Sequence, residues 1–537
     1  MEVNILYLAV VVALLGFLYR WITRNDDYFH DKPIPSMAVR PFFGASASLL
    51  FRKVSFPDFI HSLYNKYPGV KIFGMFETIT PFFVIRDPEL IKQIGIKDFD
   101  YFVDHRPTFG VDDKQSGNHP NALFRKTLFS MTGQRWKEMR ATLSPAFTGS
   151  KMRQMFSLMT ECCGGMMQHF LEKSKSTGRV EVEMKDLFGR ISMNVIASCA
   201  FGITVDCLKE QEHEFLYHGR KMMDFSRPIV IVRMMAMRIF PKLASRFGID
   251  LLDREQAEYF SQLFRETIKA RESQKIVRHD MIDLLLQAQK GTLKHQKEKD
   301  DQEGFATVQE SDVGKVEISS KMTESEMIAQ CLIFFLGGFD TVSTCAMFMA
   351  YELVRNPEAQ QKLYEEVQQT AKELEGKPIT YDVLQRMKYM DMVVSETLRM
   401  WPLAPATDRL CVRDYTIDDG QGLKFTIDKG TCVWFPAAGL HFDPQYFPNP
   451  EKFDPERFND ENKRNINLGA YLPFGIGPRN CIGSRFALME VKAFMYFILL
   501  KFSLERGEKT QIPLQLKKGF TNLGPLNGMH VVLRVRQ

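Results

Sequence analysis

The sequence lacks the cysteine patterns that mark disulfide-rich and zinc-binding proteins. Its nine cysteines include no C-x-x-C pair and no combination with histidine at a spacing suited to zinc. Neither a disulfide framework nor a structural zinc site is therefore predicted. An odd number of scattered thiols is typical of a reducing compartment.

Patterns typical of nucleic-acid-binding, repeat and nucleotide-binding proteins are also absent. The formal net charge of +5 is mild, and no basic run is interleaved with aromatic residues, so nucleic acid is not a predicted partner. No repeat of about 20 to 50 residues recurs. The segment GIGPRN at 475–480 resembles a dinucleotide fingerprint only superficially, because Asn480 replaces the third glycine and no βαβ unit surrounds it. The chain therefore has no predicted site for taking hydride from NADPH itself.

The N-terminus contains a long hydrophobic run. Residues 3–19 are almost entirely apolar, about the minimum length of a membrane-spanning helix, and Arg20 and Arg24 follow. A cleaved secretory signal would instead carry its positive charge before the apolar run and small residues after it. The positive-inside rule predicts a single-pass signal anchor over residues 1–22, with the rest of the protein in the cytosol.

The remainder is predicted to be a proline-rich hinge at 23–44 and one catalytic domain at 45–537. Its hydrophobic periodicity is mostly helical. Charged and small residues dominate 294–320, and nothing there could bury a face, so an exposed loop is predicted. Strand-like runs occur at 70–76, 81–86 and 530–535.

The segment FGIGPRNCIG at 474–483 places Cys481 in a glycine-punctuated turn. Its glycines remove side chains where a backbone must lie close to a flat cofactor, and Arg479 can reach a carboxylate at the edge of such a ring. A thiolate can be the axial ligand of haem iron, where it favours cleavage of a bound O–O bond. The alternative is one more buried cysteine, the commonest fate of that residue.

A long apolar helix is predicted from a capping box at Thr323 and Glu326 to about residue 354. The sequence GGFDT lies in its middle, at 337–341. Two glycines in a helix interior cost about 1 kcal/mol each relative to alanine. Such violations of local propensity tend to mark functional sites.

Thr341 lies four residues after Gly337, so its hydroxyl can bond the Gly337 carbonyl and open the helix locally. The resulting groove could hold dioxygen or water. The alternative is close helix packing at small residues, with Asp340 in solvent.

Two further motifs place charged residues on helix faces. Glu396 and Arg399 in ETLR can pair, although such a pair alone carries no information because exposed helices contain many of them. Trp136 and Arg140 in WKEMR lie one turn apart, so an indole N–H and a bidentate guanidinium can face the same anionic group.

In the order and spacing of these motifs, the chain resembles the cytochrome P450 superfamily. The segments FFLGGFDTVST and FGIGPRNCIG are most similar to insect detoxification members related to the mammalian drug-metabolising group. The resemblance implies a mainly α domain with a small β-sheet region, and haem b (iron protoporphyrin IX) whose metal ligand is Cys481. It also implies a monooxygenase that uses O2 and NADPH to oxidise lipophilic substrates, such as plant toxins or insecticides.

The resemblance assigns roles to individual residues. Asp340 and Thr341 are linked to the proton delivery that permits O–O cleavage, and Arg457 is expected to join Glu396 and Arg399 in a buried structural lock. Val342 stands where many relatives have a second Thr or Ser, which leaves the acid and alcohol intact. The haem-binding residues that it implies are Trp136, Arg140, Arg409, Phe474, Arg479, Cys481 and Gly483.

The resemblance to microsomal members also implies partners. The endoplasmic reticulum membrane is the expected location, a separate NADPH-dependent flavoprotein reductase is the expected electron donor, and cytochrome b5 is a second candidate partner. Basic residues near the cysteine side are candidates for a docking face, although ordinary solvated charges explain them equally well. They are Arg135, Lys137, Arg485 and Lys492.

The substrate is not specified by the sequence. Oxidation of an endogenous hormone or fatty-acid derivative remains an alternative. A haem-thiolate protein that binds a ligand without turnover would not need Asp340 and Thr341, and relatives that rearrange peroxides often lack that pair. The Met- and Phe-rich stretch at 222–247 resembles a lid near the membrane surface. Residues expected to face the substrate pocket, each also compatible with the core, are Phe124, Phe129, Phe334, Phe335, Leu403, Ala404 and Phe520.

Overall fold

The computed structural model describes residues 2–38, 43–106, 123–210, 212–275, 278–291, 304–307, 322–519 and 523–536. The fold is mainly helical with small sheets, as predicted, and it divides into two compact units. Unit 1 comprises Met1–Arg106, Pro405–Leu440 and Lys518–Phe520. Unit 2 comprises Pro107–Ala404, His441–Lys517 and Thr521–Gln537.

Unit 1 contains a four-stranded sheet in the order β1-β2-β7-β4, in which only the β2–β7 pair is parallel. Phe73, Phe82 and Trp434 belong to its buried core. The predicted runs at 70–76 and 81–86 are confirmed as β1 and β2. The strands are β1 (Ile72–Glu77), β2 (Thr80–Ile85), β4 (Thr407–Leu410) and β7 (Cys432–Phe435), with a separate hairpin of β5 (Tyr415–Asp418) and β6 (Lys424–Ile427). The helices are α1 (Glu2–Thr23), α2 (Ala47–Leu50), α3 (Phe56–Tyr64), α4 (Pro88–Lys92), η1 (Gln93–Lys97), η2 (Phe99–Tyr101) and α17 (Ala437–Leu440).

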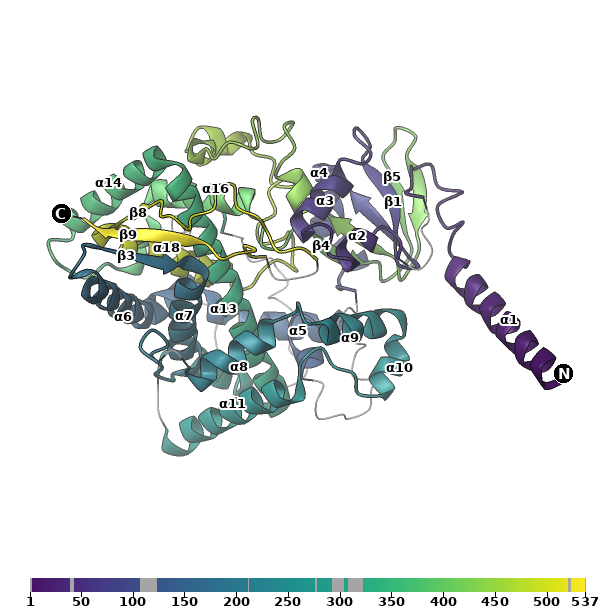
Figure 1. Cartoon of the computed structure of the whole chain (residues 1–537), viewed down its shortest axis with the longest axis horizontal. Helices are drawn as coiled ribbons and strands as arrows, with labels where there is room; N and C mark the ends of the chain where they lie inside the picture. The colour runs from purple at the N-terminus through teal and green to yellow at the C-terminus, as the bar shows by residue number, and fades with distance from the viewer. Residues whose placement is uncertain are drawn as a thin grey trace. The chain divides into compact units, whose positions relative to one another are not determined.

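Most apolar side chains of the N-terminal helix α1 are exposed, among them Leu6 (68%) and Phe17 (72%). Helix α1 is the purple helix at the start of the chain in Figure 1. In the described part of the chain, two helices are long and apolar enough to cross a membrane. The first is Ile5–Thr23, with a mean hydropathy of 2.1 and 6% of the stretch buried. The second, Glu324–Arg355, has a mean hydropathy of 1.6 and is 67% buried, so it is a core helix of unit 2.

Unit 2 is built round that core helix, α13, which packs against α7, α11, α16 and α18 (Figure 1). The predicted capping box is confirmed: the Glu326 N–H donates to the Thr323 hydroxyl at 3.2 Å, and the Thr323 N–H donates to the Glu326 carboxylate at 2.9 Å. The helices before it are η3 (Phe124–Lys126), α5 (Gly133–Leu143), η4 (Ser144–Phe147), α6 (Gly149–Ser174), α7 (Met184–Ile196), η5 (Ala197–Phe201), α8 (Glu214–Met223), α9 (Pro228–Ile239), α10 (Pro241–Arg246), α11 (Arg254–Gln274) and α12 (Met281–Gln289). From α13 onward they are α13 (Glu324–Arg355), α14 (Pro357–Glu373), α15 (Tyr381–Gln385), α16 (Lys388–Met400), η7 (Pro455–Phe458), η8 (Asn462–Asn465) and α18 (Ser484–Lys501).

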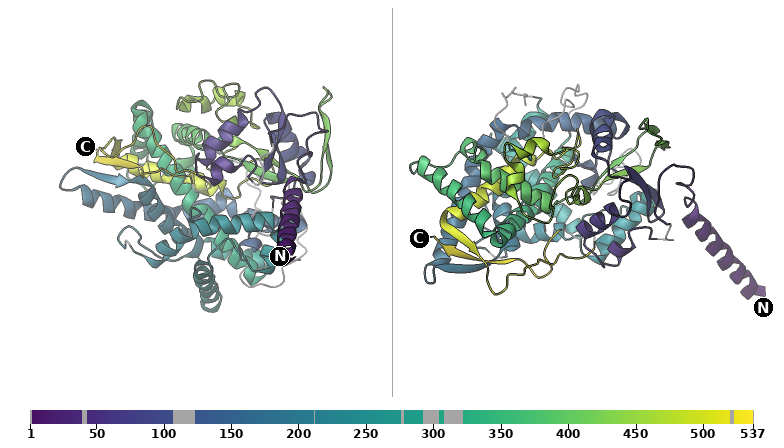
Figure 2. Two further views of the ribbon diagram at one scale, coloured as in Figure 1. Left: turned by 45° about the vertical axis from the view of Figure 1, so that its right-hand side comes forward. Right: turned by 90° about the horizontal axis from the view of Figure 1, so that it is seen from above.

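A three-stranded antiparallel sheet completes unit 2. Its order is β3-β9-β8, so β3 (Arg179–Glu183) pairs with the C-terminal strand β9 (His530–Val535), which also pairs with β8 (Phe502–Glu505). In Figure 2 the blue β3 lies beside the two yellow strands. The predicted strand at 530–535 is therefore confirmed.

The prediction that nothing in 294–320 could bury a face is wrong for the part that the structure describes. Residues 304–307 pack against other parts of unit 2, and Ala306 is only 3% exposed. Because charged residues dominate the stretch, its composition did not indicate that this short Gly-Phe-Ala-Thr segment is buried.

Candidate active site

Cys481 lies in the turn that leads into α18. Its N–H donates to the Phe474 carbonyl at 2.9 Å, and the turn before it uses left-handed backbone at Gly475 (φ 76°) and Gly477 (φ 70°). These conformations favour glycine, which explains the spacing of the motif. The helix N-terminus that follows Cys481 favours a negative charge on its sulfur.

Exposure separates Cys481 from the other cysteines, all of which the structure describes. Cys481 is exposed, Cys162 is half-buried, and the remaining seven are buried. Burial raises the pKa of Cys162 to about 12 and that of Cys345 to about 12. Those thiols are poor ligands at neutral pH, because a metal ligand must be the thiolate. The buried-cysteine alternative for Cys481 is therefore wrong.

Trp136, Arg140 and Arg479, which the sequence predicts to bind haem, lie together beside the cysteine loop. Both Nη atoms of Arg140, on α5, donate to Asn480, one to its carbonyl and one to its side-chain Oδ1, at 2.8 Å each. The Arg479 guanidinium lies 4.0 Å from the centre of the Trp136 ring and donates to the Met131 carbonyl at 2.6 Å. These contacts thus hold Arg479 and Asn480, the two residues immediately before Cys481, and contact of these side chains with haem propionates stays a prediction.

Arg409 belongs to unit 1, where its side chain on β4 is fully buried. Its Nη1 donates to the Asp408 carbonyl at 2.7 Å, and burial lowers the pKa of its guanidinium to about 10. A carboxylate beside this group would offset the cost of burying the charge. Its predicted role towards a propionate is untested.

The middle of α13 exposes one face. Gly337 and Thr341 are exposed, whereas Val342 and Phe339 beside them are buried. The Thr341 hydroxyl donates to the Gly337 carbonyl, as predicted. The helix is nevertheless continuous from Glu324 to Arg355, so the predicted local opening of the helix is not observed.

The two adjacent glycines have different surroundings. A Cβ added at Gly338 would lie 2.8 Å from Cδ1 of Ile196 on α7, whereas one added at Gly337 would meet no heavy atom within 4 Å. Close helix packing therefore accounts for Gly338. It does not account for Gly337, which leaves the exposed face uncovered.

Asp340 points towards α7. Its Oδ1 accepts from Lys185 Nζ at 2.8 Å, and the same ammonium donates to the hydroxyls of Ser343 and Thr344 at 2.8 and 2.6 Å. The alternative of a solvated Asp340 is therefore wrong. Sequence reasoning missed Lys185, because the two residues are 155 positions apart and no motif connects them.

Phe147, which the sequence did not indicate, connects the cysteine loop with α13. Its ring centre lies 5.2 Å from that of Phe334, and a Cβ on Gly483 would lie 3.9 Å from its Cε1. Arg485 also donates to the Phe147 carbonyl at 3.4 Å. Phe334 is half-buried, so it remains a candidate to line a pocket beside Gly337.

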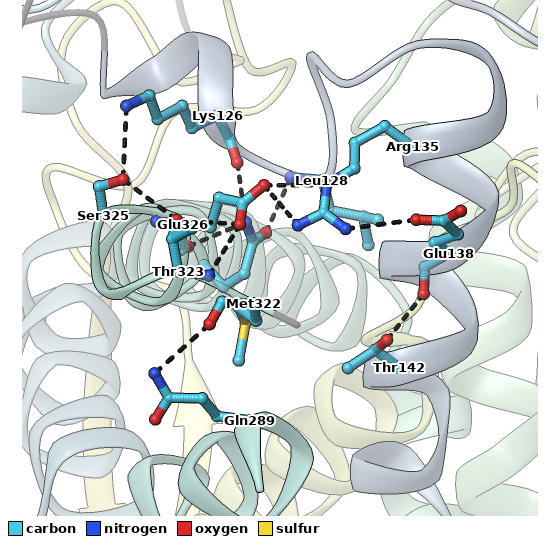
Figure 3. Close-up of polar contacts among 11 residues, drawn as sticks. Lys126, Leu128, Arg135, Glu138, Thr142, Gln289, Met322, Thr323, Ser325 and Glu326 are labelled. Atoms are coloured by element: carbon cyan, nitrogen blue, oxygen red, sulfur yellow. Dashed lines mark hydrogen bonds and ion pairs between the residues drawn. The ribbon is translucent and has the colours of Figure 1, made fainter. Parts of the chain in front are cut away.

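Figure 3 shows how the start of α13 is tied to the segment that carries Phe124 and Phe129. Gln330 accepts from the Leu128 N–H at 2.8 Å and donates to the Lys126 carbonyl at 2.8 Å. Phe124 is buried and Phe129 is 41% exposed. Of these two predicted pocket residues, Phe129 is therefore the more accessible.

The other predicted pocket residues differ in exposure. Phe335 is fully buried in an aromatic cluster with Phe260 and Phe215, at centroid distances of 4.5 and 5.4 Å, so its prediction as a pocket residue is wrong. Leu403 is half-buried and Ala404 is exposed. Phe520 lies outside the described residues.

The structure brings Glu396, Arg399 and Arg457 together in a buried network. Arg399 donates to both Glu396 oxygens at 2.7 and 2.9 Å, and Arg457 Nε lies 3.4 Å from Oε1. Arg399 also donates to the His441 carbonyl at 2.8 Å. Glu396 and Arg399 are fully buried, so the pair depends on complete hydrogen bonding.

Two of the predicted basic docking residues are engaged within unit 2. Lys492 is fully buried, with its Nζ 2.9 Å from Asp391, so its prediction as a docking residue is wrong. Arg135 Nε donates to Glu326 at 2.9 Å, as Figure 3 shows. Sequence shows that a side chain is charged but not whether folding buries it.

The donors present fit haem bound through sulfur. In the described part of the chain, no group of three or more His, Cys, Asp or Glu could hold a metal ion. One exposed sulfur can supply a single ligand, which suits haem iron because the porphyrin ring already holds the metal. The glycines of the loop and Gly337 remove side chains where such a ring would approach.

Comparison with known proteins agrees with this chemistry. Residues 35–530 match the family Cytochrome P450. The chain is 41% identical to probable cytochrome P450 9f2 of Drosophila melanogaster over 98% of both chains, and 41% identical to cytochrome P450 9e2 of Blattella germanica over 96% of this chain and 94% of that protein. It is 34% identical to cytochrome P450 6k1 of Blattella germanica over 97% of this chain and 95% of the relative. The chain therefore belongs to the cytochrome P450 family and is a haem-thiolate monooxygenase.

Proposed function

We propose that this protein oxidises small lipophilic compounds, above all xenobiotics such as plant toxins or insecticides, at the endoplasmic reticulum membrane. One observation carries the oxidation chemistry: unit 2 exposes the Cys481 sulfur and the Thr341 hydroxyl among buried neighbours, and Phe147 contacts both the cysteine loop and α13. The apolar side chains exposed on α9 and α10, among them Val232 (61%) and Leu243 (53%), are compatible with lipophilic substrates.

Four side chains of unit 2 have distinct parts in this proposal. Haem bound through Cys481 supplies the oxygen-activating chemistry. Thr341 holds a proton at Oγ1 on the exposed face of α13, with the Gly337 carbonyl as its acceptor. Lys185 holds the Asp340 carboxylate on the α7 side, so the hydroxyl rather than the acid is the group nearer the exposed face.

A substrate screen with reductase and NADPH tests the reaction. We expect oxygenated products, identified by mass spectrometry, from members of a panel of plant toxins and insecticides. A matched panel of fatty acids and steroid hormones tests the endogenous alternative. Products from the second panel alone would reject the xenobiotic proposal, and no product from either, despite a reducible haem, would reject turnover.

For α1 we propose a single-pass anchor with the catalytic units in the cytosol. The exposed apolar side chains of the helix and the arginines that follow it support this orientation. In intact microsomes, added protease should degrade residues beyond 44 without detergent. Protection until detergent is added would place them in the lumen and contradict the proposal.

A flavoprotein reductase is the proposed electron donor, with cytochrome b5 as a second donor. Lys137 is half-buried on α5 and remains a docking candidate. Lys137→Glu should slow turnover supported by the reductase while turnover supported by peroxide persists. Equal loss in both assays would reject this docking site.

A further inference from the structure

Four consecutive residues of the charged 294–320 stretch, 304–307, occupy a slot on unit 2; they are called the anchor segment below. The slot is formed by Asp391 on α16, Phe458 on η7, Lys492 on α18 and Tyr471. None of these residues was assigned to the haem site. The slot is therefore a separate feature from the haem-binding residues predicted from the sequence.

Asp391 binds the backbone of the anchor segment. Its Oδ2 accepts from the Phe305 N–H at 2.9 Å, while Lys492 Nζ lies 2.9 Å from Oδ1. A Cβ added at Gly304 would lie 1.9 Å from Oδ1 of Asp391, so the close approach requires glycine. The buried ammonium of Lys492 also donates to Gln385 at 3.1 Å, which fixes the carboxylate from behind.

Aromatic contacts hold the side chain of the anchor segment. The Phe305 ring centre lies 5.2 Å from that of Phe458 and 5.5 Å from that of Tyr471. Ala306 is 3% exposed, and the Thr307 N–H donates to the Gly304 carbonyl at 2.9 Å, which closes a turn. Gly304 is thus fixed by its small size, Phe305 by its ring, Ala306 by its burial and Thr307 by its backbone N–H.

Tyr471 connects the slot with the approach to the cysteine loop. Its hydroxyl donates to the Ser395 carbonyl at 2.9 Å, and its ring stacks on His441 at 5.4 Å with an interplanar angle of 26°. His441 Nε2 in turn accepts from the Leu472 N–H at 2.8 Å. Phe305 therefore packs on the residue immediately before Leu472.

We propose that the anchor segment is a self-recognition motif that fills a peptide-binding slot within the same chain. By filling it, the segment holds Tyr471 and supports the backbone that leads to Cys481. Phe305 is a positioning residue in this arrangement. The slot recognises a glycine, an exposed backbone N–H and an aromatic ring in succession, and its occupant is residues 304–307.

A labelled peptide of residues 301–310 tests whether the slot recognises this segment. Fluorescence anisotropy should show binding to full-length Phe305→Ala at least about tenfold tighter than to the wild type, where the tethered copy competes at high effective concentration. A peptide with alanine in place of its phenylalanine should not bind. Equal binding to both proteins, or to neither, would overturn the proposal.

Hydrogen exchange tests the positioning role, with Gly304→Ala as a second variant that leaves the slot intact. In both variants the amides of Thr307 and Leu472 should exchange at least about tenfold faster. The red-shifted absorption of the carbon monoxide complex should also decay several-fold faster. Phe51→Ala, at an exposed phenylalanine outside the predicted lid, should change neither quantity. Unchanged exchange at Leu472 in both anchor variants would overturn the positioning role.

Discussion

The buried network at Glu396 and the exposed face at Thr341 lie in the same unit but satisfy their polar groups in opposite ways. Both oxygens of Glu396 accept hydrogen bonds from Arg399, and neither side chain is exposed. Among the residues that the structure describes, Thr341 instead bonds the Gly337 carbonyl of its own helix turn, and it remains exposed. The comparison teaches that unit 2 fully satisfies its buried charges at Glu396 and Arg399 but leaves a hydroxyl in the middle of α13 accessible for chemistry.

Replacing the ligand should have the largest effect and would test whether the exposed sulfur is the one that matters. In Cys481→His the red-shifted absorption of the carbon monoxide complex of reduced haem should disappear, because it requires a thiolate ligand. Cys162→Ser, at a half-buried cysteine, should retain it. An unchanged spectrum in Cys481→His would contradict the assignment.

Substitutions in the buried network test how much it contributes to stability. Glu396→Ala removes the carboxylate that neutralises two guanidinium groups, and it should lower the free energy of unfolding by about 3–5 kcal/mol. Chemical denaturation measures this loss. Arg457→Met should cost less, because that contact is longer, at 3.4 Å, and its side chain is 12% exposed. Equal losses would show that the network is not centred on the Glu396–Arg399 pair.

His441 makes the buried network at Glu396 and Arg399 sensitive to acid. Its Nδ1 lies 3.0 Å from the Arg399 carbonyl and its Nε2 accepts from Leu472, so only the neutral ring, protonated at Nδ1, satisfies both contacts. Burial lowers the pKa of His441 from 6.5 to about 3. Because the folded pKa is the lower one, its contribution to stability is complete above pH 6.5 and is lost as the pH falls towards 3.

The expected loss from this histidine is about 1.4 kcal/mol per pH unit in that window. Denaturation curves between pH 7 and about 4 should show a shallower pH dependence for His441→Gln than for the wild type. His30→Gln, at an exposed histidine, should leave the slope unchanged. The same slope in all three proteins would show that His441 does not couple folding to acid.

The two regions also differ in how much of each could be predicted from sequence. Cys481, the Glu396–Arg399 pair and the capping box at Thr323 are patterns of close spacing, and local backbone geometry determines what they do. Lys185, Phe147 and His441 were missed because their roles arise from contacts between elements far apart in the chain. Burial explains the errors: composition suggested an exposed Lys492 and a uniformly polar 294–320 stretch, whereas packing buries Lys492 and Ala306.

On the exposed side, Thr341→Ala tests the hydroxyl. NADPH consumption should continue while product per NADPH falls about tenfold and hydrogen peroxide rises, because a positioned proton donor is removed. Thr341→Ser keeps the hydroxyl and should retain most of the coupling. Tight coupling in the alanine variant would contradict a proton role for Thr341.

The smallest effect separates the two adjacent glycines. Gly337→Ala should raise the free energy of unfolding by about 1 kcal/mol, because alanine favours the helix and nothing lies within 4 Å of the new Cβ. Gly338→Ala should give little or none of that gain, since its Cβ must displace Cδ1 of Ile196 from 2.8 Å. Turnover should fall in the more stable Gly337→Ala, because its methyl group covers the exposed face. Similar changes in thermal unfolding and product formation in both variants would show that Gly337 and Gly338 do not differ in their surroundings. The contrast between a packed side and an accessible side of α13 would then fail.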